Sequence, residues 1–163
     1  MPLVLYPDPR LNQAAVPRAV DDSLRAIGMR LLEAAKAAQA YGLAAVHTGA
    51  VAPVVVISAD PDPGQRDYLL LYNPEVLAVA EKTVIGPEGS VSMPEVQVEI
   101  LRPVWAEVAF DDETGTRQTR RFEGLPARIA LHEIDQMNGV FFLNRLSRLK
   151  RDMVLRKWKK RAG

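Results

Sequence analysis

The chain has 163 residues, of which 48% are hydrophobic and 25% are charged, and its formal net charge is +1. This length and composition predict one compact globular domain over residues 1–163, and the small net charge gives the whole molecule no nucleic-acid-binding signature. Because the chain contains no cysteine, a disulfide, a cysteine-based zinc site and a thiol nucleophile are excluded. No apolar run approaches the ~18 to 20 residues of a membrane span. The chain also begins without a charged region followed by an apolar stretch, so we expect a cytoplasmic protein.

The first predicted element is a long helix over Asp21–Gln39. Asp21 is a candidate N-cap, and Leu24, Ile27 and Leu31 recur at helical spacing. The segments that follow are short and rich in β-forming residues, and an acidic turn containing glycine predicts that the last two form a hairpin. The predicted strands are Val54–Ile57, Tyr68–Tyr72, Val96–Leu101, Val104–Phe110 and Thr116–Phe122.

A second long helix is predicted over Ala127–Asn138, where Gly139 ends it. No repeat and no linker interrupts the chain. The order of helix, several strands and helix predicts an α+β fold with mainly antiparallel strands.

The C-terminal segment, residues 147–163, differs from the rest of the chain in charge. It contains eight Lys or Arg residues against one acidic residue, Asp152, which gives +7 and leaves −6 for residues 1–146. Apolar residues recur along it at helical spacing, which predicts an amphipathic helix docked on the body with its basic residues outward. These apolar residues are Leu146, Leu149, Met153, Val154 and Trp158.

The helix over 127–138 carries an incomplete metal-binding motif. His132 is followed by Glu133, but Gln136 stands where a second histidine would complete a His-Glu-x-x-His pattern. In the complete pattern two imidazoles four residues apart bind a metal from one helical face, and the glutamate handles the proton of the metal-bound water. A His-Glu pair alone indicates little, so the interpretation depends on other segments.

Two upstream segments supply that context: Tyr41-Gly42-Leu43-Ala44-Ala45-Val46-His47 and Glu88-Gly89-Ser90-Val91-Ser92-Met93-Pro94-Glu95. With the helix motif, they resemble the peptide deformylase family in order and spacing. That family has a glycine-rich segment ending in Gln, then Glu-Gly-Cys-hydrophobic-Ser, then His-Glu-x-x-His, and its Cys and both His bind a divalent metal. The resemblance extends to Pro7–Leu11, Tyr72–Pro74, Arg102, Asp111 with Gly115, and Gly139–Phe142. It implies a peptide deformylase-like fold in which antiparallel sheets surround the central motif helix, with a C-terminal helix.

The departures from the family pattern fall on the chemistry. Ser90 replaces the ligand Cys, Gln136 replaces the second ligand His, His47 replaces a Gln expected to polarise the formyl oxygen, and Ala40 stands at a family Gly. A hydroxyl stays protonated near neutral pH and a carboxamide is a neutral, hard donor, so His132 is the one strong ligand left at the three family positions. We therefore expect no bound cofactor, with Fe(II), Zn or Ni held only if the site is remodelled.

His47 has two interpretations. The chain contains two histidines, and both occupy motif positions that line the family's active site. His47 could act as a substitute metal ligand beside His132, with Ser90 or Gln136 completing a poor site. Alternatively, it is a hydrogen-bonding or core histidine that fills the position of the family Gln.

The resemblance also implies roles for other residues. Glu133 would act as the proton acceptor, the amide of Val91 as an oxyanion donor, and His47 as a third catalytic position. Glu88, Arg102 and Asp135 are predicted to form structural ion pairs. Substrate contacts are expected from Gly42, Leu43, Gly89, Val91, Met93 and Ile129.

Two functional hypotheses follow. The first is a catalytically impaired deformylase-like protein that binds an N-terminal peptide or a small acylated ligand. The second is an active metal-dependent amide hydrolase, a deformylase or other deacylase, with a remodelled site that uses His47 and His132. Because members of the resembled family act on nascent chains, the basic C-terminal helix could contact ribosomal RNA or protein; it could also be a solvated helix that aids solubility. We expect no membrane and no DNA partner.

Overall fold

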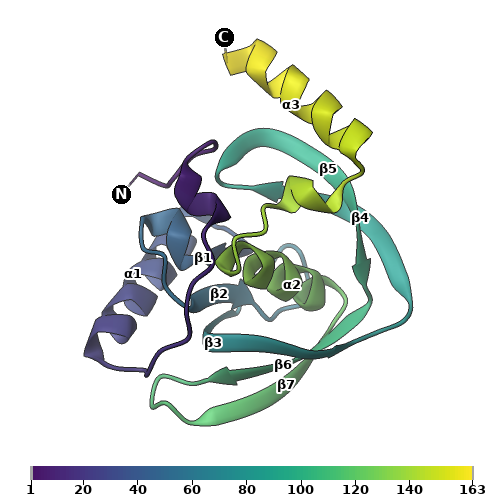
Figure 1. Cartoon of the computed structure of the whole chain (residues 1–163). Helices are drawn as coiled ribbons and strands as arrows, with labels where there is room; N and C mark the ends of the chain where they lie inside the picture. The colour runs from purple at the N-terminus through teal and green to yellow at the C-terminus, as the bar shows by residue number, and fades with distance from the viewer. Residues whose placement is uncertain (1, 163) are drawn as a thin grey trace.

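The computed structural model describes residues 2–162, so the ends of the predicted domain and of the predicted C-terminal helix, Met1 and Gly163, lie outside the described residues. The described chain contains a five-stranded antiparallel sheet in the order β1-β2-β3-β6-β7 and a two-stranded antiparallel sheet, β4-β5 (Figure 1). The strands are β1 Gly42–Ala44, β2 Val54–Ser58, β3 Tyr68–Val79, β4 Thr83–Ser90, β5 Met93–Pro103, β6 Trp105–Asp111 and β7 Arg117–Glu123.

Three α-helices accompany the sheets: α1 Asp22–Ala38, α2 Leu125–Met137 and α3 Arg148–Ala162. Three short 3-10 helices also occur: η1 Pro9–Asn12, η2 Ala45–Thr48 and η3 Phe142–Arg145. Asp21 caps α1 as predicted, because its carboxylate accepts the backbone N–H of Leu24 at 2.8 Å. None of the described helices is long and apolar enough to cross a membrane.

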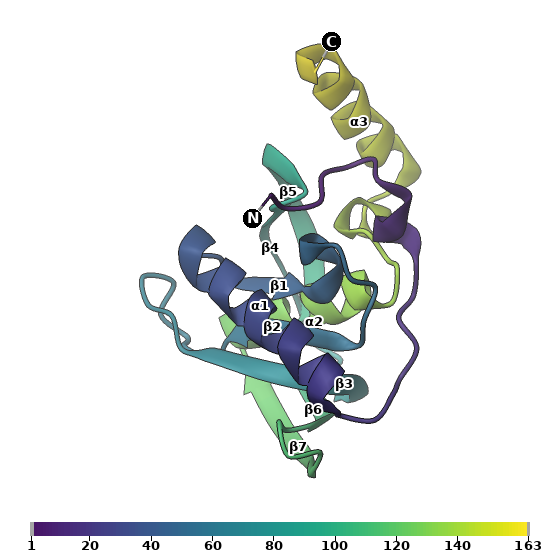
Figure 2. The same cartoon turned by 90° about the vertical axis from the view of Figure 1, so that its left-hand side faces the viewer.

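Strand β2 lies at the centre of the molecule because helices cover both of its faces. Val54 and Val56 pack with residues of α1, whereas Val55 and Ile57 pack with residues of α2. All four side chains are fully buried, as the period of two in a strand requires when both faces are covered. Figure 2 shows α1 in front of the five-stranded sheet and α2 behind it. The continuous apolar run in the sequence is therefore a strand buried on both faces.

The predicted α+β fold with antiparallel strands is confirmed, and each predicted helix and strand is present with shifted ends. Strand β4 was not predicted, although it carries part of the candidate site. Its sequence contains Gly86, Pro87 and Gly89, residues that are depleted in strands. Pairing with β5 over its whole length stabilises this strand, which local propensity alone does not predict.

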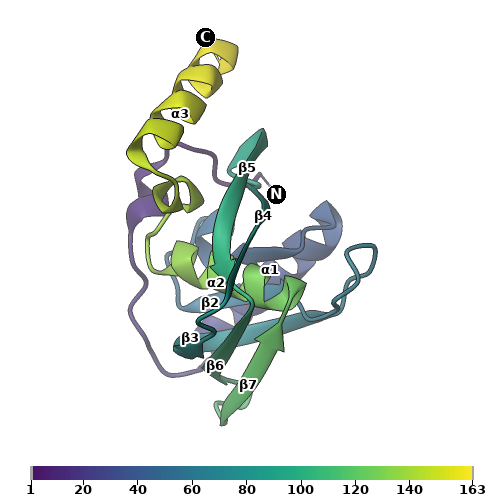
Figure 3. The ribbon, with the colours of Figure 1, turned by 90° about the vertical axis from the view of Figure 1, so that its right-hand side faces the viewer.

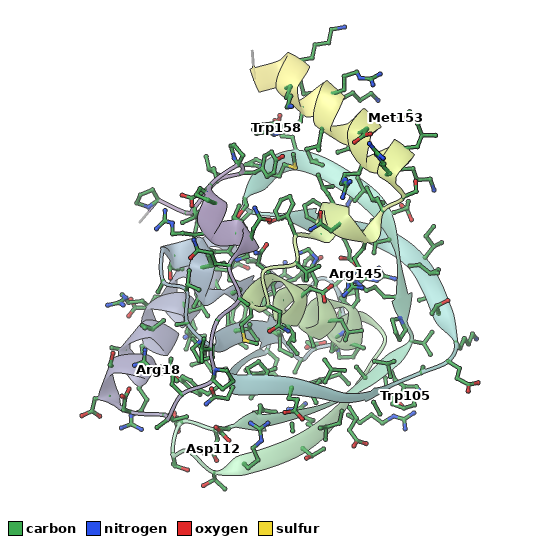
Figure 4. The ribbon with its side chains drawn as sticks, in the orientation of Figure 1. Arg18, Trp105, Asp112, Arg145, Met153 and Trp158 are labelled. Atoms are coloured by element: carbon green, nitrogen blue, oxygen red, sulfur yellow. The ribbon has the colours of Figure 1, made fainter. Side chains whose placement is uncertain are left out.

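The prediction for the C-terminal helix needs a correction. Helix α3 is present, but Leu149 and Met153, which were predicted to face the body, are 72% and 55% exposed. The side chains that pack against the core are Val154, Leu155 and Trp158. Figure 3 shows α3 projecting beyond the sheets, and Figure 4 shows Trp158 on its inner side and Met153 on its outer side. The helix touches the body along part of its length, so apolar residues remain in solvent.

Candidate functional site

A pocket of about 580 Å³ lies between α2, the segment around β1 and η2, and the β4-β5 pair. Most of the predicted site residues line it: Gly42, His47, Glu88, Gly89, Ser90, Val91, Met93, Ile129, His132 and Glu133. Leu43 does not line it and is fully buried in the core beside α1, so the structure gives it a packing position instead of the predicted substrate contact. A larger pocket of about 840 Å³, near the C-terminal end of α2, contains none of the predicted site residues.

Glu88 is the centre of a buried network of charged groups. Its two carboxylate oxygens each accept an N–H of Arg102 at 2.9 Å, and Oε2 also accepts from Arg128 at 2.7 Å. Oε1 in addition contacts Nδ1 of His132 at 2.7 Å. Burial raises the pKa of Glu88, but the hydrogen bonds from His132 and Arg102 outweigh it and lower the pKa to about 2. Glu88 is therefore ionised throughout the neutral range.

Asp135 extends this network along α2. It accepts from Nη1 of Arg102 at 2.7 Å and from two nitrogens of Arg145 at 2.9 and 2.7 Å. The predicted ion pairs of Arg102 with Glu88 and with Asp135 are thus both present. Arg128 was not singled out in the sequence, although it precedes His132 by four residues and so lies on the same helical face.

The contact with Glu88 fixes the tautomer of His132. Because Glu88 is a carboxylate, Nδ1 of His132 must donate, and in the neutral ring the lone pair is on Nε2. Burial lowers the pKa of His132, but Glu133 and Glu88 raise it more, so the net pKa lies above its usual value. His132 lines the pocket, and its Nε2 is the atom available there.

His47 has the opposite tautomer. Its Nδ1 accepts the backbone N–H of Ala44 at 3.0 Å, so the proton of the neutral ring is on Nε2. Burial, with a smaller effect from nearby His132, lowers the pKa of His47 to about 3 and keeps the ring neutral. Within residues 2–162, Nε2 is buried and has no hydrogen-bond partner. A protonated Nε2 has no lone pair for a metal, so this orientation favours the hydrogen-bonding interpretation of His47 over the ligand one.

Glu133 lies between the two histidines. Its Oε1 is 4.0 Å from Nδ1 of His47, and its Oε2 is 4.0 Å from Nε2 of His132. Oε1 is buried and has no hydrogen-bond partner in the described part of the chain. Burial is the largest cause that raises the pKa of Glu133 to about 7, with His132 opposing it. A carboxyl group with a pKa near neutrality can exchange a proton at physiological pH.

Gly42 lets β1 approach α2 at this point. A Cβ atom on Gly42 would lie 2.8 Å from Cγ2 of Ile129 and 3.0 Å from Cγ of Glu133. The carbonyl oxygen of Val56 would lie at 2.9 Å, and these distances are shorter than ordinary contacts, so any larger residue would force a shift of these side chains or of the β1 backbone. Gly42 is needed to place Glu133 at the pocket, in addition to its predicted position on the pocket wall.

The other two family metal-binding positions are already engaged. Oγ of Ser90 accepts the backbone N–H of Ser92 at 3.1 Å, and Nε2 of Gln136 donates to the carbonyl of Leu11 at 2.7 Å. Gln136 is buried and does not line the pocket. In the described chain, no three His, Asp or Glu side chains converge as a set of metal ligands.

Comparison with known proteins identifies the family. The family model for polypeptide deformylase matches residues 1–152. The chain belongs to the peptide deformylase family. It is 42% identical over 160 residues to a peptide deformylase-like protein of Bradyrhizobium diazoefficiens, covering 98% of this chain and 92% of that one. It is also 37% identical over 162 residues to a peptide deformylase of Bartonella quintana, covering 99% and 92%.

Solved structures agree with this assignment. A crystal structure of peptide deformylase from Ehrlichia chaffeensis superposes with a TM-score of 0.88 at 30% identity, covering 99% of this chain and 96% of that one. The same enzyme in complex with actinonin superposes with a TM-score of 0.87 at 32% identity and the same coverage. The predicted peptide deformylase-like fold, including a C-terminal helix, is therefore confirmed, and the pocket lies at the three segments that carry the family motifs.

Proposed function

We propose that this deformylase-family protein binds an N-terminal peptide or a small acylated ligand in the 580 Å³ pocket and lacks efficient metal-dependent deformylation. The proposal depends mainly on Gln136, whose carboxamide donates to the carbonyl of Leu11 and lies outside the pocket. A metal at the family position would have to be held by a serine hydroxyl, by His132 and by a carboxamide directed elsewhere. This set does not fit a late transition metal, which requires thiolate, imidazole or carboxylate donors.

The remaining features of the pocket suit ligand binding. Met93 and Ile129 give it apolar walls, and the backbone of Gly89 and Val91 borders it on the β4 side. A Cβ atom on Gly89 would lie 3.0 Å from the carbonyl oxygen of Val96, so glycine keeps the two strands close there. The pocket thus combines apolar surface with a few fixed polar groups, which is the usual composition of a site for a small ligand.

A remodelled amide hydrolase remains the second candidate, because one observation favours it. Glu133 is buried beside two histidines, and its pKa of about 7 is suited to proton transfer near neutral pH. This alternative needs a lone pair on Nε2 of His47, which requires the ring to give up its hydrogen bond from Ala44. The hydrogen bond that Nδ1 of His47 accepts, which leaves the proton on Nε2, therefore supports the binding proposal over the hydrolase.

Metal content and formate release test the proposal. The protein is purified without a polyhistidine tag, its metals are measured by elemental mass spectrometry, and formyl-Met-Ala-Ser is added under anaerobic conditions. We expect less than stoichiometric metal, no formate above the level of a Glu133→Ala variant, and peptide binding by calorimetry. Stoichiometric metal with formate release that Glu133→Ala abolishes would establish the hydrolase instead, and absence of peptide binding would contradict the binding function.

Restoring the family residues gives a second measurement. The combined variant His47→Gln, Ser90→Cys, Gln136→His restores the thiolate and the second imidazole on the same scaffold, and we expect it to bind one metal ion per chain. The control is the single variant His47→Gln, which provides no new ligand. If the triple variant folds but binds no metal, the pocket is not a preserved deformylase site.

We further propose that α3 contacts the ribosome in the cytoplasm. The helix carries the basic residues of the C-terminal segment, and it projects beyond the sheets, which leaves Lys159, Lys160 and Arg161 exposed. Attraction to phosphate should make co-sedimentation with ribosomes weaken steeply as salt concentration rises. Lys159→Glu with Lys160→Glu should abolish co-sedimentation, whereas Lys82→Glu with Arg121→Glu, two exposed changes outside α3, should not. Absence of co-sedimentation at low salt would show that the helix has another role.

A further inference from the structure

Glu88 and His132 form an orienting pair that does not depend on a metal. The carboxylate accepts Nδ1–H of His132 at 2.7 Å, while Arg102 and Arg128 hold the carboxylate from its other sides. The imidazole is therefore fixed in one tautomer, and the lone pair of Nε2 belongs to the pocket side of the ring. A carboxylate that orients a histidine in this way is the second half of the triad used by serine hydrolases.

Ser90 follows Glu88 by two residues at the end of β4. Along β4 the buried or half-buried positions are 86, 88 and 90, whereas 87 and 89 are exposed, and a register shift between Gly89 and Ser90 interrupts the regular pairing there. Irregularities of this kind occur next to active sites and re-aim a side chain, which here is that of Ser90 at the pocket. Ser90 and His132 both line that pocket.

Within the described chain, the hydroxyl of Ser90 accepts one hydrogen bond but donates none. Oγ accepts the backbone N–H of Ser92 at 3.1 Å, and the hydroxyl proton has no acceptor among residues 2–162. Hydrogen bonds between a nucleophile and its base are often long in the absence of substrate. Val91 follows Ser90 and also lines the pocket. The amide after a nucleophilic serine is the position from which many hydrolases stabilise the oxyanion.

We infer that Ser90, His132 and Glu88 form a metal-independent nucleophilic site that accepts an acyl group from an activated ester or thioester. Ser90 is the nucleophile, His132 is its general base, the amide of Val91 is the oxyanion donor, and Glu88 is a positioning residue. This activity goes beyond ligand binding and is separate from deformylation, because it uses the residue that replaces the family's ligand cysteine as a reactive group.

The acyl-transfer step balances without another reactant. Oγ of Ser90 attacks the acyl carbon, its proton passes to Nε2 of His132, and the carbonyl oxygen becomes an oxyanion at the N–H of Val91. The bond from the acyl carbon to the leaving oxygen or sulfur then breaks. The leaving group takes the proton from His132, which leaves an ester on Ser90 and a neutral imidazole that can deprotonate water in a second step.

Acetylation by p-nitrophenyl acetate tests the inference on the full chain in excess chelator. We expect one acetyl group per chain, located on Ser90 by peptide mapping. Ser147 is the matched internal control, because its Oγ also accepts a backbone N–H, from Lys150 at 3.2 Å, but it lies outside the pocket. We expect no acetyl group there. Acetylation of Ser90 and Ser147 at equal rates would show ordinary serine reactivity and would overturn the inference.

Two variants test the roles of the partners. His132→Asn should slow acetylation of Ser90 by about 100-fold, which is the usual minimum for loss of a general base. Glu123→Gln, an exposed change on β7 outside the pocket, should change the rate by less than about threefold. Circular dichroism shows whether each variant is folded, and if His132→Asn does not fold, His132→Gln replaces it. An unchanged rate in the folded histidine variant, or no acetyl group on Ser90 in the natural chain, would contradict the inference.

Failure of this inference is distinguishable from failure of the proposed function. Acetylation of Ser90 and binding of formyl-Met-Ala-Ser in a calorimeter are measured separately on the natural chain. Peptide binding without acetylation would remove the nucleophilic site and leave the binding function. Acetylation of Ser90 without peptide binding would remove the binding function and leave the nucleophilic site.

Discussion

Two glutamates at the pocket differ in how completely their hydrogen bonds are satisfied. Glu88 accepts N–H groups from Arg102, Arg128 and His132, whereas Oε1 of Glu133 has no partner in the described chain. Both side chains are almost fully buried, so burial does not explain the difference. An unpaired buried polar group costs about 1 to 3 kcal/mol of stability. Glu88 therefore serves as a rigid support, whereas Glu133 keeps a carboxylate oxygen free for a ligand or a proton.

Removing a cation from the paired network should have the largest effect on stability. In Arg102→Leu, Glu88 and Asp135 each lose a buried cation, so the free energy of unfolding should fall by about 4 kcal/mol in urea titrations. The matched control is Arg121→Leu, which removes an exposed ion pair with Glu123 and should cost less than about 0.5 kcal/mol. Equal effects of the two variants would mean that the Glu88 network is not a stabilising support.

Replacing the unpaired glutamate should act in the opposite direction and depend on pH. The pKa of Glu133 rises from 4.5 to about 7 on folding. Its contribution to the free energy of unfolding is therefore fully present below pH 4.5 and is lost as pH rises through 7. Glu133→Gln removes this loss, and should therefore be more stable than the natural chain by about 3 kcal/mol above pH 7.5 and about equally stable at pH 4.5.

The quantity to measure is the difference in the free energy of unfolding between Glu133→Gln and the natural chain, in the presence of a chelator. His47, whose pKa is lowered to about 3, contributes stability with the opposite slope between pH 3 and 6.5, and this contribution cancels in the comparison. Glu133 raises the pKa of His132, so the measured difference belongs to the Glu133–His132 pair. Unfolding curves at five or six pH values from 4.5 to 8 are sufficient. A constant difference across this range would show that folding does not shift the titration of this pair.

A change at Gly42 should have a smaller effect and tests how closely the unpaired glutamate is held. Gly42→Ala places a Cβ against Glu133 and Ile129, and strain of this kind costs about 2 kcal/mol. Gly64→Ala, at an exposed loop position where the nearest atom is the flexible carboxylate of Asp62, is the control and should change stability by less than about 0.5 kcal/mol. If both variants are equally stable, the approach of β1 to α2 is looser than the structure indicates.

Much of the fold was predictable because the signals are local. The N-cap Asp21, the helical repeat of leucines in α1 and the β-branched run of β2 each specify an element without reference to the rest of the chain. Strand β4 was missed because its glycines and proline disfavour a strand, and its pairing with β5 is a long-range effect. The solvent-facing side of α3 was misassigned because helical spacing does not reveal how little of a projecting helix touches the body.

The sequence predicted which residues line the candidate site but not how their side chains are oriented. Motif spacing brought His47, Ser90, His132 and Glu133 to one pocket. Two side-chain directions depend on partners remote in sequence: Gln136 turns to the carbonyl of Leu11, and the ring of His132 is set by the carboxylate of Glu88. The ring of His47 is set by a local contact with the amide of Ala44. The tautomers of the two histidines, which decide which nitrogen can act, follow from these contacts and are not encoded in any spacing.

The two ends of the described chain meet in an aromatic contact. The ring of Tyr6 lies 5.2 Å from that of Trp158, edge to face, and stacks on Phe141 at 5.3 Å. The backbone N–H of Tyr6 also donates to the carbonyl of Ser92, in the turn that follows Ser90. Because the chain has two tryptophans and the other is distant on β6, the fluorescence of Trp158 is a built-in optical signal from the junction of the N-terminal segment, the pocket turn and α3. A Trp105→Phe variant would isolate that signal and let events at either the helix or the turn be followed without an added dye.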